Sequence, residues 1–363
     1  RIWEGSDFNV EVAIKDVTEQ SRMPLAEMLS QVHPVKPLVA QRHYIETGTL
    51  RYFGQRYVDS LSKASDFECV NATHDGLIVY WMDSAKPESM PKETVDGKPL
   101  VRVQVEGLDL LRVRAKELQI LRQIQKDAPE LRGDAIARKE VKYRLVEAER
   151  LLDETIAQAF DWNTAENGCW VNGEAASVAS SRQFQNLLSE VCDRTYSQGL
   201  KLDNELINRR ELTSQGAKAR RELIESMIER GDKSDLGMQG YGPEVAMYKS
   251  VLGATRIHRE EDGFVGFYPP QTDSGVDSVW SAIETFCSES KEEQRSIQLL
   301  YDQLAKPPYG IKDGVVSVLL AAVLLNRVDD IGIYKDGTFI PVLGPEHFEL
   351  LVKDPSRFSV KSF

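Results

Sequence analysis

The sequence LAKPPYGI at residues 304–311, followed by the apolar run Val315–Leu325, decides how the last quarter of this chain folds. Two prolines and a glycine separate the helix before them from the helix after them. The run Val315–Leu325 is apolar on nearly every face, which indicates a core helix, since a helix that contacts DNA exposes polar side chains. A hairpin, Ile331–Ile340, comes next. Helix, turn, helix and two-stranded wing together predict a winged-helix-like unit over residues 291–363.

A second unit of this kind is predicted in the helical domain that spans residues 161–290. The helix Pro243–Leu252 opens with a proline, which suits the first turn of a helix. A hairpin, Arg256–Phe267, follows it with an Asp-Gly turn. Helix and then wing is again the order of a winged helix. An Asn-Gly turn predicts one more hairpin, at Cys169–Glu174.

The first 160 residues predict two further segments, a small α/β domain over residues 1–107 and an antiparallel helical hairpin over residues 108–160. In the first, the apolar run Leu77–Met82 predicts a buried strand, and residues 84–99 predict a loop or hairpin connection into the next strand. In the second, apolar residues recur every three to four positions, and each arm should be about 30 Å long. We interpret the helical hairpin as a solvated strut. The predicted fold class is therefore mainly α, in an α+β arrangement.

Composition and charge limit the class of protein. The chain has 363 residues, of which 41% are hydrophobic, and a formal net charge of −12. A free-standing, non-specific nucleic-acid binder is usually basic, because its contacts with phosphates need Lys and Arg. The four cysteines form no CxxC pair, and no apolar run reaches the roughly 20 residues that cross a membrane. We therefore expect a cytoplasmic protein without membrane contact. Because the chain starts at Arg1 and Ile2–Phe8 has the composition of a folded interior, we also expect it to be a piece of a larger protein.

Motifs for catalysis are missing from the sequence. The stretch Arg230–Ser234 contains Lys-Ser but lacks the glycine spacing of a phosphate-binding loop. The five histidines have no metal-ligand spacing, so we predict no catalytic and no metal residue. His43 and Glu46 lie together in a polar stretch, from which an enzyme site could be assembled. A structural histidine with satisfied hydrogen bonds is the favoured interpretation of His43.

One basic segment is the best candidate for contact with nucleic acid or a partner. It holds five cations within thirteen residues: Arg209, Arg210, Lys218, Arg220 and Arg221. Arginine and lysine at this density suit phosphate groups. The competing interpretation is a helix end whose cations pair with nearby glutamates at helical spacing. Those glutamates are Glu205, Glu211, Glu222 and Glu225. The sequence leaves both interpretations open.

Several segments together resemble a known family. They are Trp3–Phe8, Arg42–Phe53, Asn204–Arg210, Pro307–Gly314 and Tyr334–Phe339. With them, the chain resembles the region downstream of the ATPase domain in large multidomain P-loop ATPases of bacterial phage-defence systems of the BREX type. The resemblance implies that ATP and Mg²⁺ bind in another part of the full-length protein, and that this fragment holds no cofactor. It carries over no catalytic residue. It implies other defence-system subunits, or a second copy, as partners, with DNA as a further candidate.

The sequence thus yields one leading hypothesis and two alternatives. In the leading hypothesis the chain is a non-catalytic sensor, coupling or partner-docking region of a bacterial anti-phage defence ATPase. Any DNA contact would then be made by the basic segment. The first alternative is an autonomous winged-helix DNA-binding regulator, which the acidic net charge disfavours. The second is an enzyme whose site is assembled from residues such as His43 and Glu46.

Overall fold

The computed structural model describes residues 11–14, 23–69, 71, 73–85, 90–163, 167–271 and 275–363. The chain forms two compact units, both of which mix helices with strands, so the predicted α+β character is confirmed. The first unit contains the described residues up to Leu38 together with Tyr52–Leu187, and the second contains Val39–Arg51 together with Leu188–Phe363. These boundaries cut across the predicted segments 1–107 and 161–290. The stretch Trp3–Phe8, which carries part of the resemblance, lies outside the described residues.

A six-stranded sheet forms the centre of the first unit. Its strands follow each other in chain order: β1 (Leu38–Val39), β2 (Tyr52–Val58), β3 (Gly76–Trp81), β4 (Leu100–Gln104), β5 (Gly168–Val171) and β6 (Glu174–Ala176). Strands β2, β3 and β4 pair in parallel, whereas β5 and β6 form an antiparallel hairpin that pairs with β4. The hairpin predicted from the Asn-Gly turn is thereby confirmed, and it lies in the sheet of the first unit.

Strand β3 is buried at every position, as its apolar run predicts. Leu77, Val79 and Trp81 pack into one hydrophobic cluster. Tyr80 points to the opposite face, where its ring centroid lies 4.7 Å from that of Phe160. A strand covered on both faces needs apolar residues in succession, because neither side meets water. Since β3 and β4 are parallel, no tight hairpin joins them directly. Before β4, an antiparallel bridge between Glu93 and Pro99 encloses Asp96-Gly97, so the described part of the predicted connection includes a short hairpin turn.

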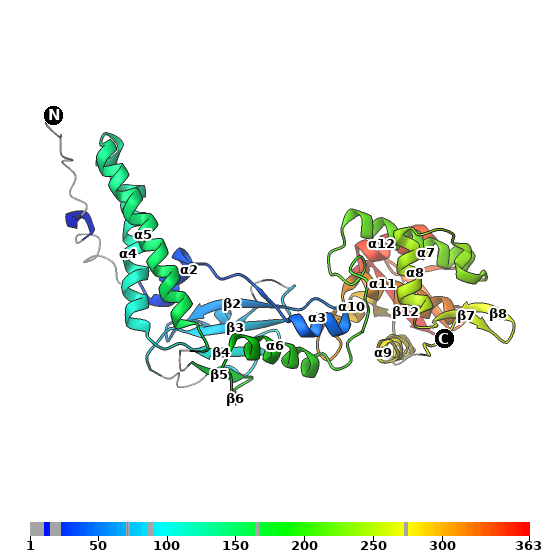
Figure 1. Cartoon of the computed structure of the whole chain (residues 1–363). Coiled ribbons are helices and arrows are strands. Elements are labelled where there is room, and N and C mark those ends of the chain that lie inside the picture. Colours follow the sequence, from blue (N-terminus) through cyan, green and yellow to red (C-terminus); the bar gives the residue numbers. More distant parts are fainter. Residues whose placement is uncertain are drawn as a thin grey trace. The chain divides into compact units, whose positions relative to one another are not determined.

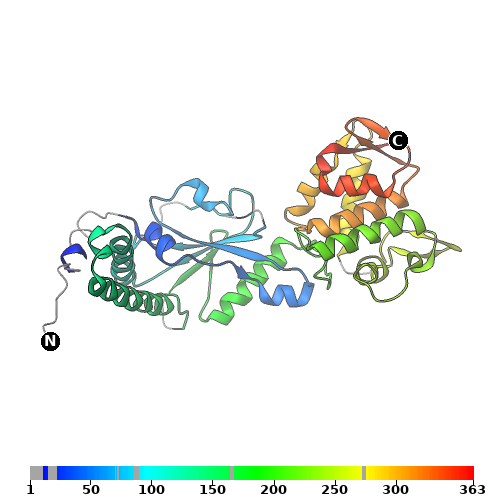
Figure 2. The same cartoon turned by 90° about the horizontal axis from the view of Figure 1, so that it is seen from above.

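Two long helices of the first unit lie side by side, as Figures 1 and 2 show. They are α4 (Leu108–Asp127) and α5 (Ala135–Ala159), and the predicted helical hairpin is confirmed. Asp134 caps α5, because its side chain accepts hydrogen bonds from the backbone N–H groups of Ile136 and Ala137 at 2.9 and 2.8 Å. A shorter helix, α2 (Leu25–Val32), packs against α4.

The second unit contains most of the remaining helices. They are α3 (Gln41–Thr47), α7 (Ser214–Arg230), α8 (Pro243–Tyr248), α9 (Val276–Ser288), α10 (Ile297–Ala305), α11 (Asp313–Asn326) and α12 (Pro345–Lys353). Helix α6 (Ser181–Thr195) begins in the first unit and ends in the second. A four-stranded antiparallel sheet has the order β11 (Thr338–Ile340), β10 (Ile331–Lys335), β12 (Phe358–Ser362) and β9 (Arg295–Ser296). A separate hairpin joins β7 (His258–Glu261) to β8 (Phe264–Phe267).

Helix α11 forms the centre of the second unit's core. Each of its residues from Gly314 to Leu324 is buried, which confirms the prediction of a core helix. Both predicted hairpins of this unit are also present. Their turns place Asp262-Gly263 and Asp336-Gly337 at positive φ, the conformation of two-residue hairpin turns that match the twist of the strands. Within the described residues, no helix combines the length and the apolar character that crossing a bilayer requires.

Candidate functional site

A loop leads from Leu202 to the start of α7, and one asparagine fixes it. The Asn208 side-chain amide donates hydrogen bonds to the carbonyl oxygens of Gly48 and Leu202, both at 3.1 Å, and to the Thr49 hydroxyl at 2.9 Å. Helix α7 then begins behind Thr213, whose hydroxyl accepts a hydrogen bond from the Gly216 N–H. Arg209 and Arg210 therefore lie just before α7, on a loop that the hydrogen bonds of Asn208 hold in one conformation.

The structure divides the five predicted contact residues between ion pairs and cavities. Arg209 pairs with Glu205 at 3.3 Å and Lys218 with Glu222 at 3.7 Å, as the structural interpretation expects. Exposed pairs of this kind contribute about 0.5 kcal/mol or less. Arg220 and Arg221 line a groove between α7 and α12, which Lys218 also borders. Arg210 lines an adjoining cavity together with Arg220.

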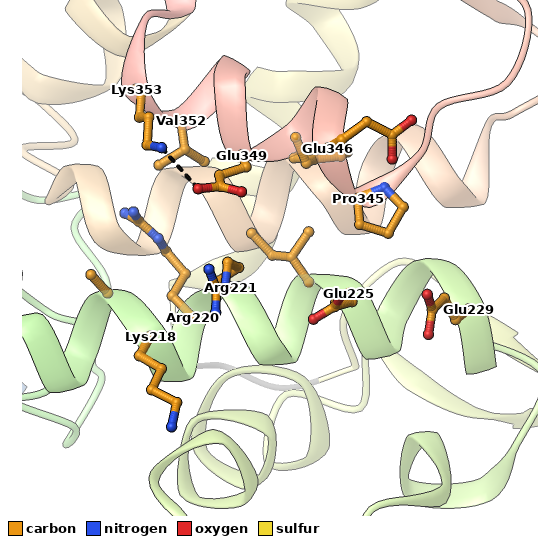
Figure 3. A pocket seen from close by; sticks show the side chains of 13 residues that line it. Lys218, Arg220, Arg221, Glu225, Glu229, Pro345, Glu346, Glu349, Val352 and Lys353 are labelled. Atoms are coloured by element: carbon orange, nitrogen blue, oxygen red, sulfur yellow. Dashed lines mark hydrogen bonds and ion pairs between the residues drawn. The ribbon is translucent and has the colours of Figure 1, made fainter.

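The groove between α7 and α12 has a volume of about 890 Å³. Figure 3 shows α7 along one side and α12 along the other. The buried side chains of Ile224 and Phe348 line it, and the half-buried Val352 adds apolar surface. A groove between two helices with apolar surface inside and charges around it can receive a further helix or an extended segment.

Charges are separated along this groove. Arg220 and Arg221 lie toward one end, and Glu225 and Glu229 follow along α7 toward the other (Figure 3). Arg221 and Glu229 are eight residues apart, which is about 12 Å along the helix axis. On α12, Lys353 pairs with Glu349 at 2.8 Å at the basic end, and Glu346 lies at the acidic end. The groove is therefore basic at one end and acidic at the other.

Arg220 lies where the groove meets a second, more polar cavity of about 470 Å³. Burial lowers the pKa of Arg220, and among the described residues its guanidinium makes no hydrogen bond or ion pair. Burial raises the pKa of Asp313, the first residue of α11, although Arg210 and Arg220 act in the opposite sense. Tyr301 in the same cavity is buried, and burial raises the pKa of its hydroxyl. Arg220 is thus a half-buried guanidinium that lines both cavities and pairs with no described carboxylate.

His43 belongs to a different, buried network of the second unit. Its Nδ1 hydrogen-bonds the Asp193 carboxylate at 2.7 Å, and its Nε2 accepts a hydrogen bond from Arg51 at 3.3 Å. Burial raises the pKa of Asp193, but the hydrogen bonds from His43 and Arg42 outweigh it, so the pKa lies below its ordinary value. With both ring nitrogens engaged and 4% of the residue exposed, His43 has the role of a structural histidine. Glu46, its suggested partner, pairs instead with Arg42.

Sequence reasoning missed the whole contribution of α12 and that of Asp313. Helix α12 lies more than a hundred residues after α7 in the chain, and no spacing links the two. Only tertiary packing of α12 on α7 brings Glu346, Glu349, Val352 and Lys353 to the predicted cations. A local signal existed for the helix itself, since Pro345 stands at its first turn.

Comparison of the chain with models of protein families, with curated proteins and with solved structures found no match. In the described part of the chain, no group of three or more His, Cys, Asp or Glu side chains is placed to hold a metal ion. The geometry of the groove and of the adjoining cavity is therefore the basis on which a function can be assigned.

Proposed function

We propose that this chain is a non-catalytic docking and coupling region, and that its second unit receives a partner protein in the groove between α7 and α12. The observation that carries this proposal is the groove itself, which combines apolar surface with separated charges and a half-buried Arg220 that pairs with no described residue. Protein interfaces are commonly built this way, with a desolvated arginine and apolar contacts surrounded by polar groups.

The setting we propose follows the resemblance. The chain would be part of a large bacterial anti-phage defence ATPase of the BREX-like kind, in which another part of the polypeptide binds ATP and Mg²⁺. Its partners would be other subunits of the defence system or a second copy of the chain. A docking region in such a protein couples the binding of a partner to the state of the ATPase.

Two winged-helix-like units are part of this proposal. For residues 291–363, the supporting observation is the order β9, α10, α11, β10 and β12, in which the last strand pairs with both β9 and β10. For residues 161–290, it is α8 followed by the β7–β8 hairpin. Helix α11 occupies the place of a recognition helix, and its burial on all faces disfavours the alternative of an autonomous winged-helix DNA-binding regulator.

A groove that receives a partner should select peptides, and filling it should abolish that selection. The test is display of random peptides of about 16 residues, long enough for roughly four helical turns, against the whole chain. Ala217 lines both cavities, so Ala217→Trp should reduce peptide enrichment to background. Ala254→Trp makes the same change at an exposed position outside the groove and should leave enrichment intact. Equal enrichment by the two variants would contradict docking in the groove.

DNA contact is a second candidate, which the position of Arg209 and Arg210 just before the N-terminus of α7 favours, since helix N-termini attract phosphates. Because the chain is acidic overall, we expect weak binding of duplex DNA, at micromolar levels or poorer. A plot of the logarithm of the binding constant against the logarithm of the salt concentration should have a slope of about −0.9 for each phosphate contacted. Changing both arginines to alanine should flatten that slope by about one to two units.

Electrophoretic mobility shifts at two salt concentrations measure this slope, and a thermal melt of the same double variant reports on folding. We expect the melting temperature to change little, because the Arg209–Glu205 pair is exposed. If the unaltered chain gives no shift at low salt, DNA contact is refuted, while docking in the groove is unaffected.

A further inference from the structure

The surroundings of the Arg220 guanidinium indicate which chemical group of a partner would bind there. Its side chain is half-buried where the groove meets the adjoining cavity, and none of the described carboxylates pairs with it. The Asp313 carboxylate acts on the Arg220 charge through space, but the described residues form no ion pair between the two. The planar guanidinium of Arg220 can donate two parallel hydrogen bonds to a carboxylate on a bound molecule. Each of these charged hydrogen bonds is stronger than a hydrogen bond between neutral groups. Arg220 is therefore placed to receive a carboxylate from a molecule bound in the groove.

The rest of the groove defines what accompanies that carboxylate. Figure 3 shows the Arg220 side chain extending from α7 toward α12, whereas Lys218 points away from α12. Past Arg220, the wall of α7 presents Glu225 and Glu229, for which the described residues supply no ion pair. These glutamates lie five and nine residues after Arg220, about 7.5 and 13.5 Å along the helix axis. A cation placed between them would therefore lie roughly 10 Å from the carboxylate on Arg220, which is about two helical turns.

We propose that the groove binds an amphipathic helix of a partner protein that places an Asp or Glu on Arg220. About seven or eight residues away, the same helix places a Lys or Arg against Glu225 and Glu229, with an apolar residue between them against Val352. This inference rests on the proposed docking function and names the chemistry of the partner. The two helices of the groove form a trough into which a third helix packs, with its apolar face inward.

Peptides enriched from the random library test the pattern. We expect enriched sequences to contain an acid and a base seven or eight residues apart with an apolar residue between, in either chain direction. Enrichment of apolar peptides without an acid would overturn the inference but leave docking in place, provided that Ala217→Trp abolishes it. Failure of the unaltered chain to enrich any peptide would overturn both.

A charge swap tests Arg220 itself, with an enriched peptide as the probe and fluorescence anisotropy as the readout. Arg220→Glu should weaken binding by about 30-fold or more, the usual effect of breaking a buried charge pair at an interface. Replacing the peptide's acid with Arg should restore most of that loss in Arg220→Glu and weaken binding to the unaltered chain. Lys233→Glu is the matched control, because Lys233 is an exposed cation of the same unit that lines neither cavity, and it should change affinity by less than about threefold.

Folding of each variant is checked by thermal melting, and Arg220→Gln serves where Arg220→Glu lowers stability. The neutral variant should also bind at least about tenfold more weakly, while it retains the groove. If Arg220→Gln binds as tightly as the unaltered chain, or if the peptide with the swapped charge fails to rescue Arg220→Glu, the proposed carboxylate contact is wrong.

Discussion

Leu320→Asp is expected to unfold the second unit. Leu320 is fully buried at the centre of α11, and core residues surround that helix on all sides. A carboxylate placed there has no partner and costs several kcal/mol, which is comparable with the total stability of about 5–15 kcal/mol that a domain has. The change also removes apolar surface, which adds to the loss.

Trp280 provides the measurement, because it is buried in the same core and is the one tryptophan of the sequence that falls in the second unit. With fluorinated tryptophan, its ¹⁹F resonance should lose the shift of the folded state in Leu320→Asp. Leu299→Asp makes the same substitution at a residue of α10 that is 53% exposed, and it should keep the folded shift. A folded spectrum for Leu320→Asp would show that α11 is not a core helix.

Arg51→Ala is expected to cost about 2–5 kcal/mol and to release α3 from the second unit. Arg51 is 1% exposed, and its guanidinium donates to the Gly310 carbonyl oxygen at 2.9 Å and lies 3.7 Å from the centroid of the Tyr196 ring. Its loss leaves a cavity and deprives both Gly310 and His43 of a hydrogen-bond donor. A bulkier residue cannot replace Gly310, since φ there is +60° and a Cβ would lie 2.5 Å from the guanidinium.

Hydrogen exchange of the α3 amides measures this effect together with a urea melt. Protection of α3 should fall sharply in Arg51→Ala. The control is Arg357→Ala, which removes an exposed arginine that pairs with Asp336 at 2.5 Å, and it should leave the free energy of unfolding almost unchanged. An equal loss of unfolding free energy in Arg51→Ala and Arg357→Ala would mean that burial of Arg51 does not contribute to stability.

Local features of the fold could be predicted from the sequence, because they depend on neighbouring residues. Turn residues at Asn172-Gly173 and Asp262-Gly263 specify hairpins, and the spacing of apolar residues specifies the pair α4 and α5. The strand β3 and the helix α11 are recognisable because burial on all sides requires uninterrupted apolar runs.

Features that depend on distant contacts could not be predicted. The assignment of Val39–Arg51 to the second unit depends on buried hydrogen bonds from Arg51 and Asn208, which no local pattern encodes. The basic segment was found from its composition, but that composition could not separate Arg209, which pairs with Glu205, from Arg220, which pairs with no described residue. That difference arises only from packing against α10, α11 and α12.

The early position of α3 in the chain also affects how the protein is made. Arg51 leaves the ribosome long before its acceptor at Gly310, which is 259 residues further on. At a synthesis rate of about 5–20 residues per second, the delay is roughly 13–50 s. During that time the first unit can complete its sheet, while Arg51 stays hydrated and α11 has not yet been synthesised. The second unit therefore folds around a segment that has waited since early in translation, and a nascent chain halted before Gly310 should leave α3 accessible to proteases.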